Sequence, residues 1–271
     1  MRSDENILTK WGLPVVALFL TGTTSAHDPV FGVGPHVLYK DGIEIHAGAH
    51  QEKSDERTTE SEFELKYGIT GDWAIGAGIS YISSDSHDGT EKGRGPSKLF
   101  TKYRFWREDT FAAQESAAIF GQVIFDDGEN NHHNVKREDN DYLLGLAYGY
   151  EGRKWYRWAS VRHRFNADAE GGIERPDVWK VDLVGGIRFT PSEYQEPDWV
   201  WMLDLNGEIF EHVSQPNKQL GGEQWFSSPG LMWTYRNVAL KAGVQFSISD
   251  NLSSDQKGDD YRTLIEFEWH L

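Results

Sequence analysis

The residues that could bind a metal ion or move a proton are histidines and carboxylates near the two ends of the chain. In an extended conformation the stretch IEIHAGAH puts Glu44, His46 and His50 on one face, because successive side chains of a strand point to opposite faces. His270 lies in the last extended segment, and His27 would offer an amine as well as an imidazole if the chain were processed just before it. Imidazole and carboxylate groups suit transition metals, so these five residues are candidate ligands. His46 and His50 would lie about 13 Å apart at a rise of ~3.3 Å per residue, too far to share one ion. The alternative is that they are ordinary polar residues facing water.

The segments that position these residues have a two-residue period. Twelve stretches alternate between apolar and polar residues, and no helical period is sustained. Each has roughly the 9–11 residues or more that a tilted strand needs to cross a bilayer. The segments are residues 43–52, 58–70, 73–84, 97–107, 111–125, 139–151, 155–166, 177–190, 199–211, 223–235, 238–249 and 259–271. Pro229 cannot donate a ladder hydrogen bond, so its segment needs a bulge or a late start.

Composition excludes several classes of protein. The chain has 271 residues, of which 38% are hydrophobic, and its mean hydropathy is −0.61, too polar for a bundle of membrane helices. It has no cysteine, which excludes disulfides and thiolate chemistry. A net charge of −16 without a basic tract disfavours nucleic acid as a partner.

The first 26 residues have the pattern of a secretory signal peptide. Arg2 and Lys10 precede a short apolar run from Trp11 to Leu20, and small residues follow up to Ala26. The run is too short for a spanning helix, and a membrane anchor is the alternative. We therefore predict a signal peptide at 1–26, a periplasmic N-terminal segment at 27–42 and the barrel at 43–271.

The connections between the segments alternate in length. The short ones are 71–72, 108–110, 152–154 and 236–237, with 191–198 intermediate and in the same phase. The long ones are rich in Asp, Asn, Gly and Ser, at 85–96, 126–138, 167–176, 212–222 and 250–258, and all but 212–222 have an excess of acid. Short turns at one end and long polar loops at the other are typical of an outer-membrane barrel. The fold class predicted is all-β, a transmembrane antiparallel β-barrel of about 12 strands with short periplasmic turns and long acidic extracellular loops.

Aromatic residues gather beside the short turns, as the interfacial girdle of such a barrel requires. They are Tyr67, Trp73, Phe105, Phe111, Tyr148, Tyr150, Trp155, Phe189, Trp199, Trp201, Trp233, Tyr235, Phe267 and Trp269. The C-terminal stretch YRTLIEFEWHL alternates to its last residue, so the final strand is expected to pair with the first and to end at the rim. This ending resembles the C-terminal signature by which the barrel-assembly machinery recognises outer-membrane barrels, although Leu271 stands where Phe or Trp is preferred.

Side-chain parity assigns charged residues of both signs to the lumen. The candidate path-lining residues are Glu62, Glu64, Lys66, Lys102, Arg104, Asp182, Arg188, Asp204, Glu208, Lys241, Arg262 and Glu266. Twelve strands lie between barrels filled by side chains and barrels with an aqueous channel. The charges could line a narrow water-filled path, or they could pair across the lumen and close it. The acidic loops predict a cation-attracting outer mouth.

An enzymatic reading has weaker support. His212-Val213-Ser214 resembles the His-x-Ser pair of outer-membrane phospholipase, a twelve-strand barrel, and a His could deprotonate a neighbouring Ser. Parity turns both residues towards the lumen, and Asn217 is too close in sequence for the family's pattern. Asn131-His132-His133-Asn134, in a long loop, is a further weak metal candidate. We expect no enzymatic activity and no cofactor.

The stretch HDPVFGVGPHVLYKDGIEI, and GVGPHVLYKDG above all, resembles the start of outer-membrane barrels of the "MetA-pathway of phenol degradation" type. The resemblance implies a channel for aromatic or other small solutes and transfers no functional residues. The sequence therefore predicts a channel in the outer membrane of a Gram-negative bacterium that passes small solutes through a charged lumen. Its expected partners are outer-membrane lipid, the barrel-assembly machinery and an unidentified small solute. The alternatives are a closed structural barrel, a metal-binding barrel and a lipid-modifying enzyme.

Overall fold

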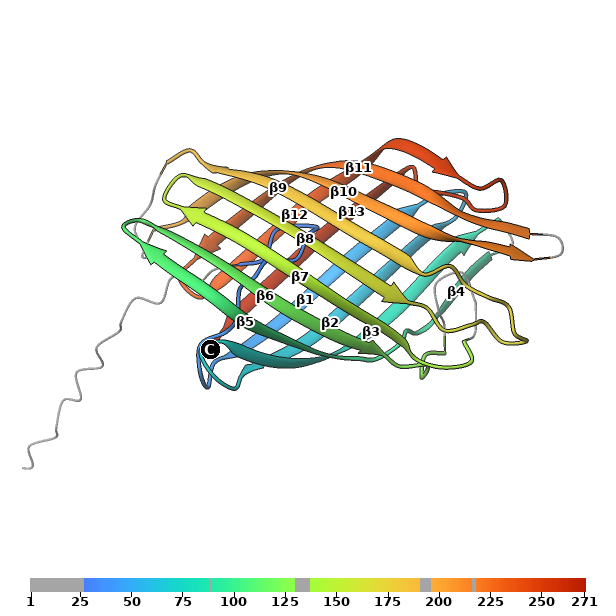
Figure 1. Cartoon of the computed structure of the whole chain (residues 1–271), viewed down its shortest axis with the longest axis horizontal. Coiled ribbons are helices and arrows are strands. Elements are labelled where there is room, and N and C mark those ends of the chain that lie inside the picture. Colours follow the sequence, from blue (N-terminus) through green and yellow to red (C-terminus); the bar gives the residue numbers. More distant parts are fainter. Residues whose placement is uncertain (1–26, 88, 130–136, 191–195, 216–217) are drawn as a thin grey trace, which may run out of the picture.

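Antiparallel strands form one closed sheet in the computed structural model (Figure 1), which describes residues 27–87, 89–129, 137–190, 196–215 and 218–271. Strands that follow one another in sequence pair, except that β4 and β5 both pair with β3, and β1 pairs with both β2 and β13. The strands are β1 (Ile43–Lys53), β2 (Arg57–Gly68), β3 (Trp73–Ser86), β4 (Gly89–Arg94), β5 (Lys98–Thr110), β6 (Ala113–Ile124), β7 (Asp141–Gly152), β8 (Trp155–Phe165), β9 (Val178–Arg188), β10 (Asp198–Gln215), β11 (Lys218–Tyr235), β12 (Val238–Leu252) and β13 (Tyr261–His270). The described residues contain no helix long and apolar enough to cross a membrane.

The predicted barrel of about 12 strands is confirmed. β4 and β5 both pair with β3. β5 pairs with the half of β3 next to the short turn (Trp73 to Gly78) and β4 with the other half (Tyr81 to Ser86), so these two strands share one position in the wall. The last strand closes the barrel on the first, with Ile45 opposite Trp269, and Leu271 exchanges backbone hydrogen bonds with Ile43 at 2.8 and 3.2 Å. A closed sheet has no unpaired edge, which explains why the alternating pattern runs to the end of the chain.

Two of the predicted long loops are wrong, because the strands continue through them. Within the range 85–96, β4 pairs back onto β3, from Ser86 opposite Gly89 to Tyr81 opposite Arg94. Residues 212–222 belong largely to β10 and β11, which reach Gln215 and Lys218. Polar residues pair as strands here because backbone hydrogen bonding does not require an apolar face once the strands extend beyond the membrane.

Two irregularities change which way side chains point. The ladder between β11 and β12 shifts at Trp225/Phe226, and no pair is formed at Pro229, as the missing N–H requires. A second shift, between Phe210 and Val213 of β10, turns Val213 inward and leaves His212 and Ser214 exposed. The prediction that parity turns His212 and Ser214 to the lumen is therefore wrong, because one extra residue in a strand reverses every later side chain.

The outer face of the barrel is apolar, and the predicted girdle lies at its short-turn end. Leu65, Ile79, Leu144 and Leu203 have half or more of their surface exposed, whereas a water-soluble fold would bury such residues. Trp73, Phe105, Trp155 and Trp199 are exposed beside the short turns. Such an exterior is stable only against lipid, so the chain spans the outer membrane of a Gram-negative bacterium.

Residues 27–38 lie inside the barrel. This segment, the lumen plug, runs along the lumen as the dark-blue trace in Figure 1. Val30 and Leu38 are buried, as are Pro29 and Pro35. This location differs from the prediction of a periplasmic segment at 27–42. Only Tyr39 to Gly42 lie at the short-turn rim, where the Asp41 N–H donates to Gly68 O at 2.8 Å. Residues 1–26 and Asn131-His132-His133-Asn134, as well as Asn217, lie outside the described residues.

Candidate functional site: the lumen plug and the cavity beside it

One side of the lumen is apolar and holds the plug. Val30, with 3% of its surface exposed, packs in a cluster with inward-facing residues of four consecutive strands. They are Tyr156 and Trp158 of β8, Val184 of β9, Val200 and Met202 of β10, and Met232 of β11. Val33 packs on a second cluster of Phe120, Leu143 and Ala147. Burying a valine side chain contributes about 1.5–3 kcal/mol, so these contacts favour a seated plug.

Polar contacts fix the plug at several points. The carboxylate of Asp28 and the carbonyl oxygen of Gly34 both accept from Lys102 Nζ, at 2.8 and 2.9 Å. The backbone N–H of Phe31 donates to Asp204 Oδ2 at 3.2 Å. His27 Nδ1 lies 2.7 Å from Glu268 Oε2. The plug therefore bridges opposite sides of the lumen.

A further polar contact joins the plug to the apolar side of the lumen. His36 of the plug contacts the carboxylate of Glu151, and the indole Nε1–H of Trp158 donates to the same carboxylate at 2.9 Å. Trp158 thus packs on Val30 through its ring and positions the acceptor of His36 through its nitrogen. A buried indole usually finds such an acceptor.

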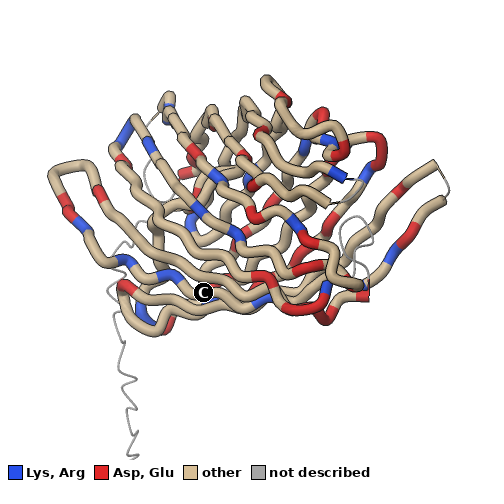
Figure 2. Tube along the Cα trace, turned by 45° about the vertical axis from the view of Figure 1, so that its right-hand side comes forward, with Lys and Arg blue, Asp and Glu red and all other residues tan. Residues whose placement is uncertain are grey.

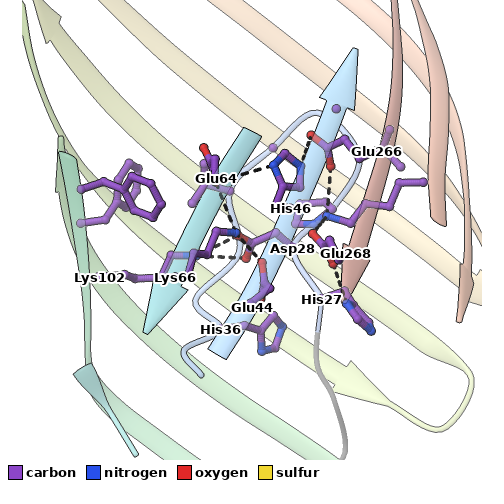
Figure 3. A pocket seen from close by; sticks show the side chains of 18 of the residues that line it. His27, Asp28, His36, Glu44, His46, Glu64, Lys66, Lys102, Glu266 and Glu268 are labelled. Carbon is purple, nitrogen blue, oxygen red and sulfur yellow. Dashed lines mark hydrogen bonds and ion pairs between the residues drawn. The ribbon is translucent and has the colours of Figure 1, made fainter. Parts of the chain in front are cut away.

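The opposite side of the lumen is charged, and a cavity of about 960 Å³ lies between it and the plug. We call the lumen-facing residues of β1, β2, β5, β12 and β13 the charged wall. Figure 3 shows Glu44 and Lys66 of this wall beside Asp28 of the plug, and His46 between Glu64 and Glu266. The cavity reaches from Gly71 and Asn237 at the short turns to Glu60 and His50, near the outer ends of β1 and β2. Ten basic and nine acidic residues line it, so its own charge is nearly balanced.

The charges of this wall are paired. Lys66 Nζ lies 2.7 Å from Glu44 Oε1, and Lys98 contacts both Glu62 and Glu64. Lys241 Nζ lies 2.6 Å from Glu268 and 3.3 Å from Glu266. Charges buried in this way are stable only when paired, because each unpaired ion costs several kcal/mol of desolvation. Figure 2 likewise shows both signs interspersed along the strands.

A second network crosses the outer half of the lumen. The guanidinium of Arg262 on β13 donates to Glu208 on β10 at 2.8 and 3.1 Å, and Lys180 Nζ donates to the same carboxylate at 2.7 Å. Arg262 also contacts Asp259 at 2.8 Å. Arg262 and Glu208 lie on strands that are not neighbours in the sheet, so their contact crosses the lumen and narrows it.

The twelve predicted path-lining residues face the lumen, and ten of them line the cavity: Glu62, Glu64, Lys66, Lys102, Arg104, Asp182, Glu208, Lys241, Arg262 and Glu266. The other two lie elsewhere. Arg188 pairs with Asp198 at 2.5 Å near the short-turn rim, and Asp204 is covered by the plug. Whether these residues line a path for solutes stays a prediction.

Sequence reasoning missed the plug residues and the apolar wall. A signal was present, because parity places Tyr156 and Trp158 of β8, and Val200 and Met202 of β10, on the lumen face. Apolar residues on the wet face of a barrel indicate that something apolar covers them. Sequence reasoning also missed Lys98, whose amine joins Glu62 and Glu64, because it lies at the start of its segment.

The candidate metal ligands are distributed over two levels. His27, His270, Glu44 and His46 lie together near the short-turn end of the cavity. His50 lies higher on β1, opposite Glu60 and Leu264, and does not join them. In the part of the chain that the structure describes, two groups have ligand atoms within 4.8 Å of one another: His27, Glu268 and His270, and His46, Glu266 and Glu268.

Comparisons with known proteins show similarity in fold. No protein family matches the chain, and no curated protein matches it in sequence. The COG4313 outer membrane channel from Pseudomonas putida F1 superposes with a TM-score of 0.60 at 11% identity, covering 88% of this chain and 98% of that one. The NanC porin superposes with a TM-score of 0.51 at 10% identity, covering 84% of this chain and all of that one. At such identities the likeness establishes the outer-membrane barrel fold and no more.

Proposed function

We propose that the protein is an outer-membrane channel for small polar solutes, with the path running between the plug and the charged wall. The observation that carries the proposal is the cavity of about 960 Å³, which extends to residues of the short turns and is lined by charges of both signs. A lumen built only for stability would be filled by side chains, as it is in eight-stranded barrels. The structural likeness to an outer-membrane channel and to a porin supports the same function.

The competing function is a closed structural barrel, which the Arg262–Glu208–Lys180 network favours. Under either function, we propose that residues 1–26 are a secretory signal and that the assembly machinery recognises the C-terminal strand. They differ in whether the network opens. Salt bridges between flexible side chains rearrange far faster than backbone does, so the channel proposal requires no movement of the strands.

Ion selectivity is expected to arise in the loops and not in the cavity. The net charge is −16, whereas the cavity lining is nearly balanced, so the excess of acid lies elsewhere. Exposed loop charges attract cations to the outer mouth, and salt screens this attraction over a Debye length of about 10 Å at 0.1 M and 3 Å at 1 M. We expect a cation preference that weakens between these two concentrations.

Planar-bilayer recording of the refolded protein tests the proposal. Folding is checked first by a heat-dependent gel shift. Discrete current steps, with a reversal potential showing cation preference in 0.1 M salt, are the expected result. A folded barrel that passes no current would favour the closed barrel, and an anion preference would overturn the assignment of selectivity to the acidic loops.

A further inference from the structure

Two histidines from distant parts of the chain meet at the short-turn end of the cavity. His27 of the plug and His270 of β13 lie with ring centroids 4.9 Å apart, edge to face. Together with Glu268 they offer ligand atoms that all lie within 4.8 Å of one another. His27 is 5% exposed, and its Nε2 has no hydrogen-bond partner among the described residues. The imidazole of His27 is therefore buried with part of its hydrogen-bonding capacity unused by the described residues.

Each imidazole has a carboxylate oxygen beside it that no lysine uses. Glu268 contacts Lys241 through Oε1 and presents Oε2 to His27 Nδ1 at 2.7 Å. Glu44 contacts Lys66 through Oε1 and presents Oε2 to His270 Nε2 at 3.5 Å. The ligand atoms that converge are those of His27, His270 and Glu268, from the plug and β13, and Glu44 of β1 adjoins this group through its contact with His270. The dashed lines in Figure 3 include the contact between His27 and Glu268.

We propose that His27, His270, Glu268 and Glu44 bind one divalent transition-metal ion of the Zn²⁺ type. Imidazole nitrogen and carboxylate oxygen are usual ligands of four-coordinate Zn²⁺, at about 2.0–2.2 Å. Ligand atoms in such a tetrahedron are about 3.3 Å apart, so separations of up to 4.8 Å in the group must shorten by as much as about 1.5 Å, and the 2.7 Å contact of His27 with Glu268 must lengthen. His27 can supply that movement because it belongs to the plug and to no strand of the sheet. The two lysines keep their own carboxylate oxygens.

The neighbouring group of His46, Glu266 and Glu268 fits an ion less well. It contains a single imidazole, and Lys241 lies between its two carboxylates, 3.3 Å from Glu266 and 2.6 Å from Glu268. An ammonium group there already supplies the positive charge. The His27 group is therefore the site. An ion bound in it would join the start of the plug to the last strand, residues 241 positions apart.

Zn²⁺ titration calorimetry of the folded protein in detergent tests the site. The full chain is expressed with residues 1–26 and purified from outer membranes, and the heat-dependent gel shift confirms that each variant folds. We expect one ion per chain, and at least tenfold weaker binding in His270→Gln and in His27→Gln. His50→Gln is the matched control, because His50 faces the same lumen higher on β1 and should bind as the wild type does.

Hydrogen exchange of peptides covering residues 27–38 gives a second readout that does not depend on conductance. Zn²⁺ should slow exchange in the wild type and in His50→Gln, and leave it unchanged in His270→Gln, whose substitution lies in the wall and not in the plug. No Zn²⁺ binding by the wild type, or binding as tight as that of the wild type in both His27→Gln and His270→Gln, would overturn the site. Both outcomes are separate from failure of the channel proposal, which only current measures.

Discussion

Val30 of the lumen plug lies directly against Gly230 of β11, where an added Cβ on the glycine would come within 2.8 Å of Val30 Cγ2. The glycine leaves room that any side chain would fill, and the valine occupies it. The plug thus fits its wall at the level of single atoms. This fit makes its position testable.

A disulfide between these two positions should form. The ideal Cβ on Gly230 lies 3.1 Å from Val30 Cβ, and disulfides need about 3.5–4.5 Å, so a shift of a few tenths of an ångström suffices. The chain has no cysteine of its own, so Val30→Cys with Gly230→Cys reports this contact alone. Oxidation should protect both thiols from alkylation, as measured by mass spectrometry.

The matched control is Val30→Cys with Gly185→Cys. Gly185 is exposed on β9, beside inward-facing Val184, and an added Cβ there meets nothing within 4 Å. That pair should stay reduced within one chain. Free thiols in the Gly230 pair after oxidation would mean that the plug is not seated as described.

Asp127 should hold the β6–β7 connection against the β4–β5 junction in a pH-dependent way. Its carboxylate accepts from Ser97 N–H at 2.8 Å, Ser97 Oγ–H at 2.7 Å and Arg94 Nη2 at 2.6 Å. Partial burial raises the pKa of Asp127, but these donors and the charge of Arg94 outweigh it and hold the pKa below the usual 3.8. The stabilisation of this contact by the ionised carboxylate is therefore complete above pH 3.8 and is lost as the pH falls through the lowered pKa of Asp127.

Hydrogen exchange of residues 94–97 and 125–129, corrected for intrinsic rates, measures this contact. Protection should be constant from neutral pH to about 4 and fall below that. Asp127→Asn keeps the shape and removes the charge, so its protection should be lower at neutral pH and insensitive to acid. Equal protection of the two proteins at neutral pH would refute the role given to the carboxylate.

Trp269 should matter for assembly more than an equivalent girdle residue does. Trp269 on β13 and Trp199 on β10 are both tryptophans of the short-turn girdle, 40% and 50% exposed. If the assembly machinery reads the C-terminal strand, Trp269→Ala should lower the amount of heat-modifiable barrel in outer membranes several-fold. The amount of heat-modifiable barrel in Trp199→Ala should stay close to that of the wild type. An equal loss in both variants would show that Trp269 contributes only interfacial anchoring.

The strands and their faces could be predicted because a two-residue period is visible in sequence. The seam of β1 and β13 followed from the alternation at 261–271, and the charged lumen from parity in strands such as β2 and β13. Parity failed where a bulge intervenes, at His212 and Ser214, because a bulge leaves no mark in the order of residue types. The pairing of β4 with β3 could not be predicted because β4 is polar on both faces.

The plug could not be predicted because its position depends on contacts and not on local pattern. Residues 27–38 have no period, and their prolines and glycines read as a connection. Only the inward parity of Tyr156, Trp158 and Met202 indicated an apolar partner inside the barrel. The meeting of His27 with His270 likewise depends on the plug folding back to the last strand.

The central claim is that solutes pass between the plug and the charged wall, and single-channel recording with cysteine probes tests it most directly. Gly48 of β1 lines the cavity, and an added Cβ there makes an ordinary contact with Glu266 Cγ at 3.4 Å. Ala47 is exposed on the opposite, lipid-facing side of the same strand. A positively charged thiol reagent should lower the current of Gly48→Cys channels in a discrete step and leave Ala47→Cys channels unchanged. Conducting Gly48→Cys channels that react with the reagent and keep their full current would contradict a path along this wall.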